Sequence, residues 1–407
     1  MIIIKSQYNT LKPSNIREAN IKQIIKIFRL SSELMSRAEI SRKISLSAPS
    51  VSSIISNLID ANILFERQEG RSSSSGGRRP IMLELNKDCG FIIGVYIKYE
   101  ELIIVLVNYK GEIVDKDEIN YFKEFNSSCE QILINSIEVL LKNNDVEKEK
   151  ILSIGVAIPG VFDNEDKVIK FAPNIKTWEN MPIKEELKNA FDCEVIVENA
   201  VNTAVLGEKL KGKINGKENA IYIKIDKGIG AGVLINGKLY EGFKNLAGEI
   251  GFMVSTEDML LDKESEYGSL EKSYSIKAIC EQANDFFPEE NIDFSKIVEK
   301  ANEGDEKINK LLDNASTKIA LTIANIICVI SPEIVVIGGM FNEIAPIFIN
   351  KINNIIERIV PVPPKIVLSE LGDKVYYTGA IVQSLDDIES KLINKYIKQT
   401  IKRKNPF

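Results

Sequence analysis

The sequence of 407 residues contains no histidine. It therefore offers no imidazole that could act as a catalytic base or bind a metal ion. Its five cysteines are far apart and form no C-x-x-C pair. This spacing argues against a disulfide framework and against a cysteine-rich zinc site, and it predicts a protein of a reducing compartment.

Long apolar segments are also missing. The N-terminal residues lack the apolar stretch of about 7–15 residues that a signal peptide needs. The most apolar run covers residues 319–330 and ends at Ser331 and Pro332, which is too short to cross a bilayer. We therefore expect a cytoplasmic protein that does not enter a membrane.

Charged residues are present in ordinary amount, but their signs are unevenly distributed along a chain that is long enough for two or three domains. Residues 1–88 have a formal net charge of +6, whereas residues 89–407 have −12. A basic head on an acidic body indicates a head that binds a polyanion such as DNA. A basic surface that is merely solvated would give the same count.

The head has the residue pattern of a helix-turn-helix. A first helix is expected to end near Leu30, with Asn15 as its N-terminal cap. Ser36 and Ser47 are expected to cap two further short helices, with Pro49 in the first turn of the last one. Two short helices around a tight turn favour a DNA-binding motif, and a helical hairpin that only packs is the alternative.

The outward face of the last of these helices carries small polar residues at its N-terminal end, where a helix in the major groove meets base edges. The N–H groups at that end can also bind a phosphate. The residues of the two helices that we expect at the DNA are Arg37, Ser47, Ala48, Pro49, Ser50, Ser52, Ser53 and Asn57.

Residues 71–80 read RSSSSGGRRP and lie between two expected strands, at residues 63–65 and 81–85. A loop that joins two strands after a helix-turn-helix is typical of a wing, whereas a plain linker needs no flanking strands. The wing residues that we expect to reach phosphates or a narrow minor groove are Arg71, Arg78 and Arg79.

Beyond residue 89 the sequence alternates between strands and helices. One β-meander begins at FIIGVYI, and a related one begins at AIYIKI. Helical stretches are expected at residues 130–142, 200–211, 305–330 and 387–402. Two similar meanders in separate halves predict an α/β body of two lobes with a cleft between them.

With these features the chain resembles the ROK family, which groups repressors, open reading frames and sugar kinases on the actin-like ATPase fold. In the head the resemblance lies in SRAEIS, SLSAPSVSSII and GGRRP; in the body it lies in AIPGVFD, APNIKTW, VENAVNTAVLGE, GIGAGVLING, LAGEIGF and EIVVIGGMF. It implies an α/β protein with an N-terminal winged helix-turn-helix followed by a two-lobed actin-like ATPase fold. The implied parts are a DNA-binding domain at 1–88, a first lobe at 89–203 plus 380–407, and a second lobe at 204–379.

Three departures from the family's kinases argue against catalysis. The kinases hold ATP phosphates with a D-x-G-G-T loop, whereas this place begins at Tyr96, whose ring would fill the phosphate pocket. In a second phosphate loop, Asp226 and Lys227 replace Gly-Thr. The aspartate that serves the kinases as base is replaced by Ala200, and a lost base removes roughly 10²–10⁴-fold of rate. We expect no enzyme and assign no catalytic residue.

The family's zinc site is also absent from the sequence pattern. Phe252 stands in place of the zinc-binding histidine, and none of the three zinc cysteines is present. We therefore assign no metal and no cofactor.

Part of the family's sugar site is retained. Carboxylates and amides suit an array of hydroxyl groups because each accepts or donates in a fixed direction. The residues that the resemblance implies for a saccharide effector are Asn174, Asn199, Glu249 and Glu271. The alternative is that the two glutamates only tie loops together.

These features predict a sequence-specific transcriptional repressor of sugar-utilisation genes. It would bind a double-stranded DNA operator as a homodimer or homotetramer and respond to a saccharide effector. Xylose or a xyloside is the first candidate, because the resemblance extends to xylose repressors of the family. The alternatives are a ROK sugar kinase with an attached DNA-binding head and a constitutive DNA-binding regulator without a sugar inducer.

Overall fold

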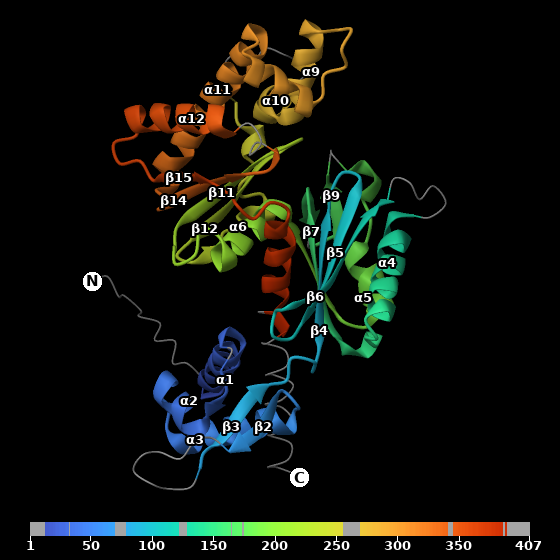
Figure 1. Cartoon of the computed structure of the whole chain (residues 1–407), viewed down its shortest axis with the longest axis vertical. Coiled ribbons are helices and arrows are strands. Elements are labelled where there is room, and N and C mark those ends of the chain that lie inside the picture. The colour runs from blue at the N-terminus through green and yellow to red at the C-terminus, as the bar shows by residue number, and fades with distance from the viewer. Residues whose placement is uncertain are drawn as a thin grey trace, which may run out of the picture.

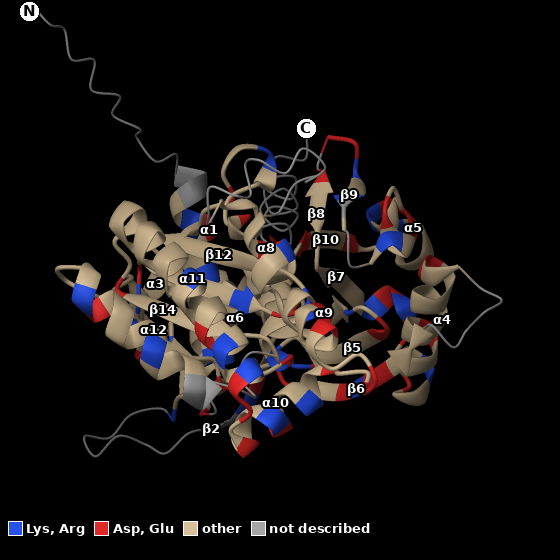
Figure 2. Ribbon diagram, turned by 90° about the horizontal axis from the view of Figure 1, so that it is seen from above, with Lys and Arg blue, Asp and Glu red and all other residues tan. Residues whose placement is uncertain are grey.

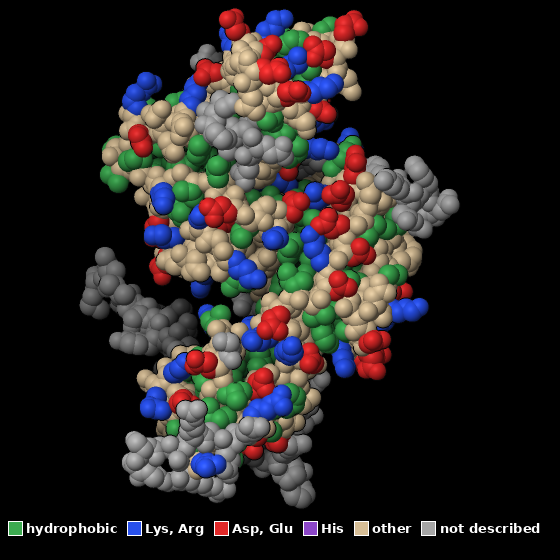
Figure 3. Space-filling model, viewed as in Figure 1, with side chains coloured by type: hydrophobic (Ala, Val, Ile, Leu, Met, Phe, Trp, Pro, Cys, Tyr) green, Lys and Arg blue, Asp and Glu red, His purple; other side chains and the backbone are tan. Residues whose placement is uncertain are grey.

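The computed structural model describes residues 13–31, 33–69, 79–121, 128–163, 165–172, 175–254, 269–340, 345–385 and 387–388. They form a small head and a body of two lobes, with a helix of residues 374–385 between the lobes (Figure 1). Acidic and basic residues of the body are interspersed along the ribbon in Figure 2, and their side chains are interspersed on the face shown in Figure 3. The acidic excess of the body is therefore not gathered into one patch in these views.

The head consists of three helices and a small antiparallel sheet with the strand order β1-β3-β2. Its elements are α1 (Pro13–Leu30), β1 (Met35–Ser36), α2 (Arg37–Ile44), α3 (Ala48–Asp60), β2 (Leu64–Glu69) and β3 (Ile81–Leu85). Apolar side chains of all three helices and the sheet form one core.

The expected caps are confirmed at two of three helices. The Ser36 side chain accepts a hydrogen bond from the backbone N–H of Glu39, whose carboxylate accepts one from the Ser36 N–H, which is a complete capping box. Ser47 caps α3 in the same way through Ser50. The cap expected at Asn15 is wrong, because α1 begins at Pro13. Proline is favoured in the first turn of a helix, where its missing N–H costs nothing.

The first lobe contains a five-stranded sheet with the order β10-β7-β4-β5-β6. Its elements are β4 (Phe91–Ile97), β5 (Glu101–Asn108), β6 (Ile113–Asn120), α4 (Cys129–Asn143), β7 (Ile151–Ile158), the hairpin β8 (Val161–Asp163) and β9 (Val168–Phe171), α5 (Ile183–Phe191) and β10 (Glu194–Asn199). Along β4, Ile93 and Val95 pack into the core with α4 and α5. Ile92 and Tyr96 point to the opposite face, toward the second lobe.

The second lobe contains a five-stranded sheet with the order β13-β12-β11-β14-β15. Its strands are β11 (Ala220–Ile225), β12 (Ile229–Ile235), β13 (Lys238–Leu239), β14 (Ile334–Gly338) and β15 (Lys365–Leu368). Its helices are α8 (Ser269–Tyr274), α9 (Ile276–Phe286), α10 (Phe294–Glu303), α11 (Glu306–Ile330) and α12 (Ala345–Ile359). Short 3₁₀ turns occur in the body at η2 (Lys148–Lys150), η3 (Lys176–Trp178), η4 (Phe243–Asn245) and η5 (Ile250–Phe252).

Among the described residues, helix α11 has the length and the apolar composition that a membrane-spanning helix would need. Half of its apolar stretch is buried within the protein, and its inward side chains belong to the core of the second lobe. The core helix of a globular protein can have the same length and composition as a membrane-spanning helix.

The two sheets share a core that also contains α6 (Ala200–Lys211) and the helix of residues 374–385. Gly155 of β7 and Gly379 of that helix allow close approach, because a Cβ at either would collide with a backbone carbonyl, that of Ala380 or of Thr203 respectively. The helix at 374–385 was not expected from the sequence, and the one expected at 387–402 lies almost wholly outside the described residues. The domain boundaries expected at 203/204 and 379/380 fall within these two helices.

Candidate DNA-binding face and effector cleft

The helix-turn-helix is built by α2 and α3. Val51, Ile54, Ile55 and Leu58 of α3 are buried in the head core, and the polar side of the helix is left outside. Of the residues expected at the DNA, those exposed on or beside α3 are Ser47, Ala48, Pro49, Ser50, Ser52 and Ser53, and Asn57 is half-buried. The exposed N-terminal end of α3 is thus available to a groove.

Arg37 is not free in this arrangement. Its guanidinium donates to the Glu66 carboxylate of β2 over 2.8 Å, and both side chains are partly exposed. Surface ion pairs of this kind contribute about 0–1 kcal/mol. A phosphate could therefore replace Glu66 at small cost.

Strands β2 and β3 pair antiparallel, with Leu64 opposite Leu85 and a register shift after Glu66. The loop expected as a wing is thus flanked by two paired strands. Arg79 is exposed at its C-terminal end. Arg71 and Arg78 lie outside the described residues.

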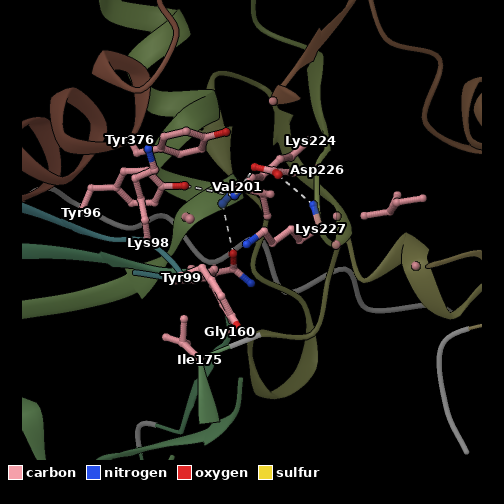
Figure 4. A pocket seen from close by; sticks show the side chains of 18 of the residues that line it. Tyr96, Lys98, Tyr99, Gly160, Ile175, Val201, Lys224, Asp226, Lys227 and Tyr376 are labelled. Carbon is pink, nitrogen blue, oxygen red and sulfur yellow. Dashed lines mark hydrogen bonds and ion pairs between the residues drawn. The ribbon is translucent and has the colours of Figure 1, made fainter. Parts of the chain in front are cut away.

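A cavity of about 610 Å³ lies between the lobes and is lined by residues of both (Figure 4). Among the residues expected at an effector, Asn199, Glu249 and Glu271 all line it, and Asn174 lies outside the described residues. Asn199 ends a strand of the first lobe, whereas both glutamates belong to the second lobe. The polar groups expected from separate motifs therefore meet across the cleft.

Asn199 faces Glu249 directly. Its side-chain nitrogen donates to Oε1 of Glu249 over 3.3 Å, while its oxygen caps α6 by accepting from the Val201 N–H. Burial and the nearby Glu271 raise the pKa of Glu249 to about 7. Burial likewise raises the pKa of Glu271, which accepts a hydrogen bond from the Ile229 N–H over 2.7 Å.

Both glutamates line the cavity, and hydroxyl groups are suitable donors for their carboxyl oxygens. One oxygen of Glu271 is bound to the backbone of β12, so this residue also ties a loop in place. The two hypotheses for the glutamates, that they bind an effector and that they tie loops together, are therefore compatible in this structure.

The cavity lining also contains a polar cluster around Lys224, a residue that the sequence did not indicate. Lys224 donates to the hydroxyl group of Tyr96 over 3.0 Å and lies 3.5 Å from the Asp226 carboxylate. Tyr376 stacks on Tyr96 with 4.2 Å between ring centroids. Lys224 is the one charged residue of the strand AIYIKI, and a lysine in such an apolar strand is the signal that could have revealed it.

A second group missed from the sequence is the buried Glu198, which precedes Asn199. It accepts hydrogen bonds from the Asn199 N–H, from the Asn202 side chain and from Gln383 of the helix at 374–385. Burial raises the pKa of Glu198. Glu198 thus fixes the backbone at Asn199 against that helix.

No group of three or more histidine, cysteine, aspartate or glutamate side chains in the described ranges could hold a metal ion.

The ROK family model matches residues 92–384. Over 391 residues the chain is 29% identical to a protein of Caldicellulosiruptor bescii named "Xylose repressor", covering 91% of this chain and 97% of that protein. A glucokinase of Thermotoga maritima is 26% identical over 284 residues, which are 66% of this chain and 88% of that enzyme. The relative that matches nearly the whole chain is thus named as a regulator, and the kinase matches less of it.

Among solved structures, a ROK family transcriptional regulator described as a homologue of the E. coli MLC protein resembles this chain with a TM-score of 0.76 and 23% identity. The match covers 94% of this chain and 99% of the other. This confirms the predicted fold, an N-terminal winged helix-turn-helix followed by a two-lobed actin-like ATPase fold.

Proposed function

The chain belongs to the ROK family, and from this we propose that it is a DNA-binding transcriptional repressor of sugar-utilisation genes whose cleft binds a saccharide. One observation carries the proposal. Asn199, Glu249 and Glu271 line one cavity between the lobes, while Ala200, beside them, offers no base. The cleft can therefore hold hydroxyl groups but lacks the group that would activate one of them.

Xylose or a xyloside is the first candidate for the effector. The support is that relatives covering most of the chain are named xylose repressors. A neutral polyhydroxyl compound also suits two carboxyl groups that lie close together, because it adds no further negative charge. Asn174 completes the proposed set of effector residues.

The proposed DNA contacts are the exposed residues of α3, Arg37 and the wing arginines. We place the protein in the cytoplasm and expect a homodimer or homotetramer, in which two copies of α3 enter successive major grooves of an operator. We retain the division into a head at 1–88, a first lobe at 89–203 plus 380–407 and a second lobe at 204–379.

The proposed mechanism uses the position of the cleft. An effector held by both lobes favours one interlobe angle, and the spacing of the two heads in an oligomer changes with that angle. Shifting an operator from mostly bound to mostly free requires a few kcal/mol of differential binding.

The test has two steps. First, the full-length protein selects binding sites from a pool of random duplexes, and anisotropy gives its affinity for the best one. Second, D-xylose, other monosaccharides and short oligosaccharides are tested for thermal stabilisation and for their effect on this affinity. We expect one sugar to do both, and Asn199→Ala to remove the sugar effect while leaving affinity for the operator unchanged.

Two results would contradict the proposal. Release of ADP with any common pentose or hexose would make the chain a kinase. Operator binding that no sugar changes, with no sugar stabilising the protein, would make it a constitutive regulator.

A further inference from the structure

A lysine in the lining of the cleft joins the second lobe to the first. Lys224 comes from β11, and its ammonium group donates to the hydroxyl group of Tyr96 in β4 over 3.0 Å. These two strands belong to different sheets. Only 12% of the Lys224 side chain is exposed, so water competes little for this hydrogen bond.

Three elements surround the ammonium group. Asp226, just beyond β11, lies 3.5 Å away. The ring centroids of Tyr376, from the helix at 374–385, and of Tyr96 lie 5.0 Å and 5.7 Å from the nitrogen. Figure 4 shows the two rings side by side, with Lys224 and Asp226 facing them. Both lobes and the helix between them therefore hold the same cation.

The surroundings of Lys224 favour its charged form. Burial by itself lowers the pKa of Lys224, but Tyr96 and Asp226 raise it, and the net shift is upward. Burial raises the pKa of Tyr96. Both shifts favour a charged lysine that donates to a neutral tyrosine.

We infer that Lys224 is a positioning residue that bridges the lobes and sets the angle at which the effector groups meet. The inference rests on the proposed function. Asn199 belongs to the first lobe, and Glu249 and Glu271 to the second, so the three converge only at the right interlobe angle. A ligand that needs a fractionally populated state binds more weakly by that fraction. The bridge keeps the fraction high before any ligand arrives.

The chain contains a matched contact that differs in burial. Lys227 lies 3.7 Å from the ring centroid of Tyr99 and also joins the second lobe to the first. Both partners are three residues further along the sequence than Lys224 and Tyr96, and both are exposed. Water weakens a cation–π contact at an exposed site. Lys227→Met is therefore the control for Lys224→Met.

The experiment uses the full-length chain without sugar. Spin labels at Glu186→Cys on α5 and Lys310→Cys on α11, both exposed sites on different lobes, report the distribution of interlobe distances. The exposed native Cys328 is replaced by serine. We expect Lys224→Met to broaden the distribution and Lys227→Met to leave it unchanged.

The second measurement is affinity for D-xylose by calorimetry. We expect Lys224→Met to weaken binding about tenfold and Tyr96→Phe, which keeps the stacked ring, about threefold, with Lys227→Met within about twofold of the parent. Tyr96→Phe carries the test if Lys224→Met does not fold.

A narrow, parent-like distance distribution in Lys224→Met, together with a changed melting temperature, would overturn the inference and leave Lys224 a structural residue. For a Lys224→Met that does not fold, the same result in Tyr96→Phe would do so. If no sugar binds the parent but the distribution still broadens, the bridge stands and the proposed effector fails.

Discussion

The head is joined to the first lobe through an apolar contact, whereas the two lobes, besides the apolar core that their sheets share, face each other across a polar cleft. Tyr109, at the end of β5, is fully buried and belongs to the core of the head. The guanidinium of Arg29 lies 5.1 Å from its ring centroid. Between the lobes, by contrast, hydrogen bonds such as Asn199 to Glu249 cross an open cavity.

Backbone hydrogen bonds further strengthen the contact between the head and the first lobe. The Asn86 N–H donates to the Ile63 carbonyl of the head, and the Tyr109 N–H donates to the Lys87 carbonyl, each over 2.9 Å. A short connection bound at both ends, with a buried ring beside it, has little freedom. We therefore expect the head to move with the first lobe and any adjustment to occur at the cleft between the lobes.

The largest effect is expected from Tyr109→Ala. Loss of a buried aromatic ring lowers the free energy of unfolding by about 3–5 kcal/mol. Because the ring belongs to the head core, we expect the head to melt separately from the body in calorimetry. Sugar affinity should stay unchanged while the sugar effect on operator binding is lost.

Tyr109→Phe is the control, because it keeps the ring and its packing. We expect it to melt in a single transition as the parent does. If head and body of Tyr109→Ala still melt together, Tyr109 does not hold the head to the first lobe.

The polar cleft between the lobes should respond to pH, whereas the apolar contact between the head and the first lobe should not. Glu249 has a pKa raised from 4.5 to about 7 by burial and by Glu271, so the folded protein holds its proton more tightly than the unfolded chain. The stabilisation is full below about pH 4.5 and is lost as the pH rises through about 7, with an upper value of about 3 kcal/mol.

Denaturant titrations from pH 5 to pH 8 measure this loss. Glu249→Gln should flatten much of the pH dependence of the free energy of unfolding, because the amide mimics the protonated carboxyl group. The remaining slope belongs to other groups, including Glu271. An unchanged slope in Glu249→Gln would mean that Glu249 is ionised throughout.

The side chains that contact DNA should all belong to the head. Replacing Arg71, Arg78 and Arg79 with alanine should weaken binding to every duplex, and the log–log salt slope should become shallower by about 0.9 per lost phosphate contact, or about 3 in total. Affinity for operator and random duplexes across a salt series measures both effects.

Replacing Ser52 and Ser53 gives the matched variant without loss of charge. The salt slope should stay, while preference among operator variants should relax by about 1–3 kcal/mol per lost base contact. If the arginine variant binds random DNA as well as the parent, residues 71–80 are a linker.

The parts of the structure that could be predicted from sequence depend on local signals. Ser36 and Ser47 act within one helical turn, so their caps follow from the residues beside them. The two meanders are likewise visible as alternating strands and turns. The cap expected at Asn15 is wrong because Pro13, two residues earlier, already starts the helix.

The parts that could not be predicted depend on distant contacts. The helix at 374–385 is rich in aromatic and β-branched residues, such as Tyr376 and Ile381, and is buried on nearly every side. It therefore shows no amphipathic stripe. The bridge at Lys224 joins residues 128 positions apart, and no spacing in the sequence connects Lys224 with Tyr96.

The smallest effect should come from an exposed ion pair between the head and the first lobe. Lys87 and Glu112 lie 3.9 Å apart, and about half of each side chain is exposed. Lys110 lies 3.1 Å from the same carboxylate, so Glu112 keeps a partner when Lys87 is removed. Lys87→Met should change the free energy of unfolding by less than about 0.5 kcal/mol, measured by denaturant titration at low and high salt. A larger, salt-dependent loss would show that charge, and not the buried ring of Tyr109, holds the head to the first lobe.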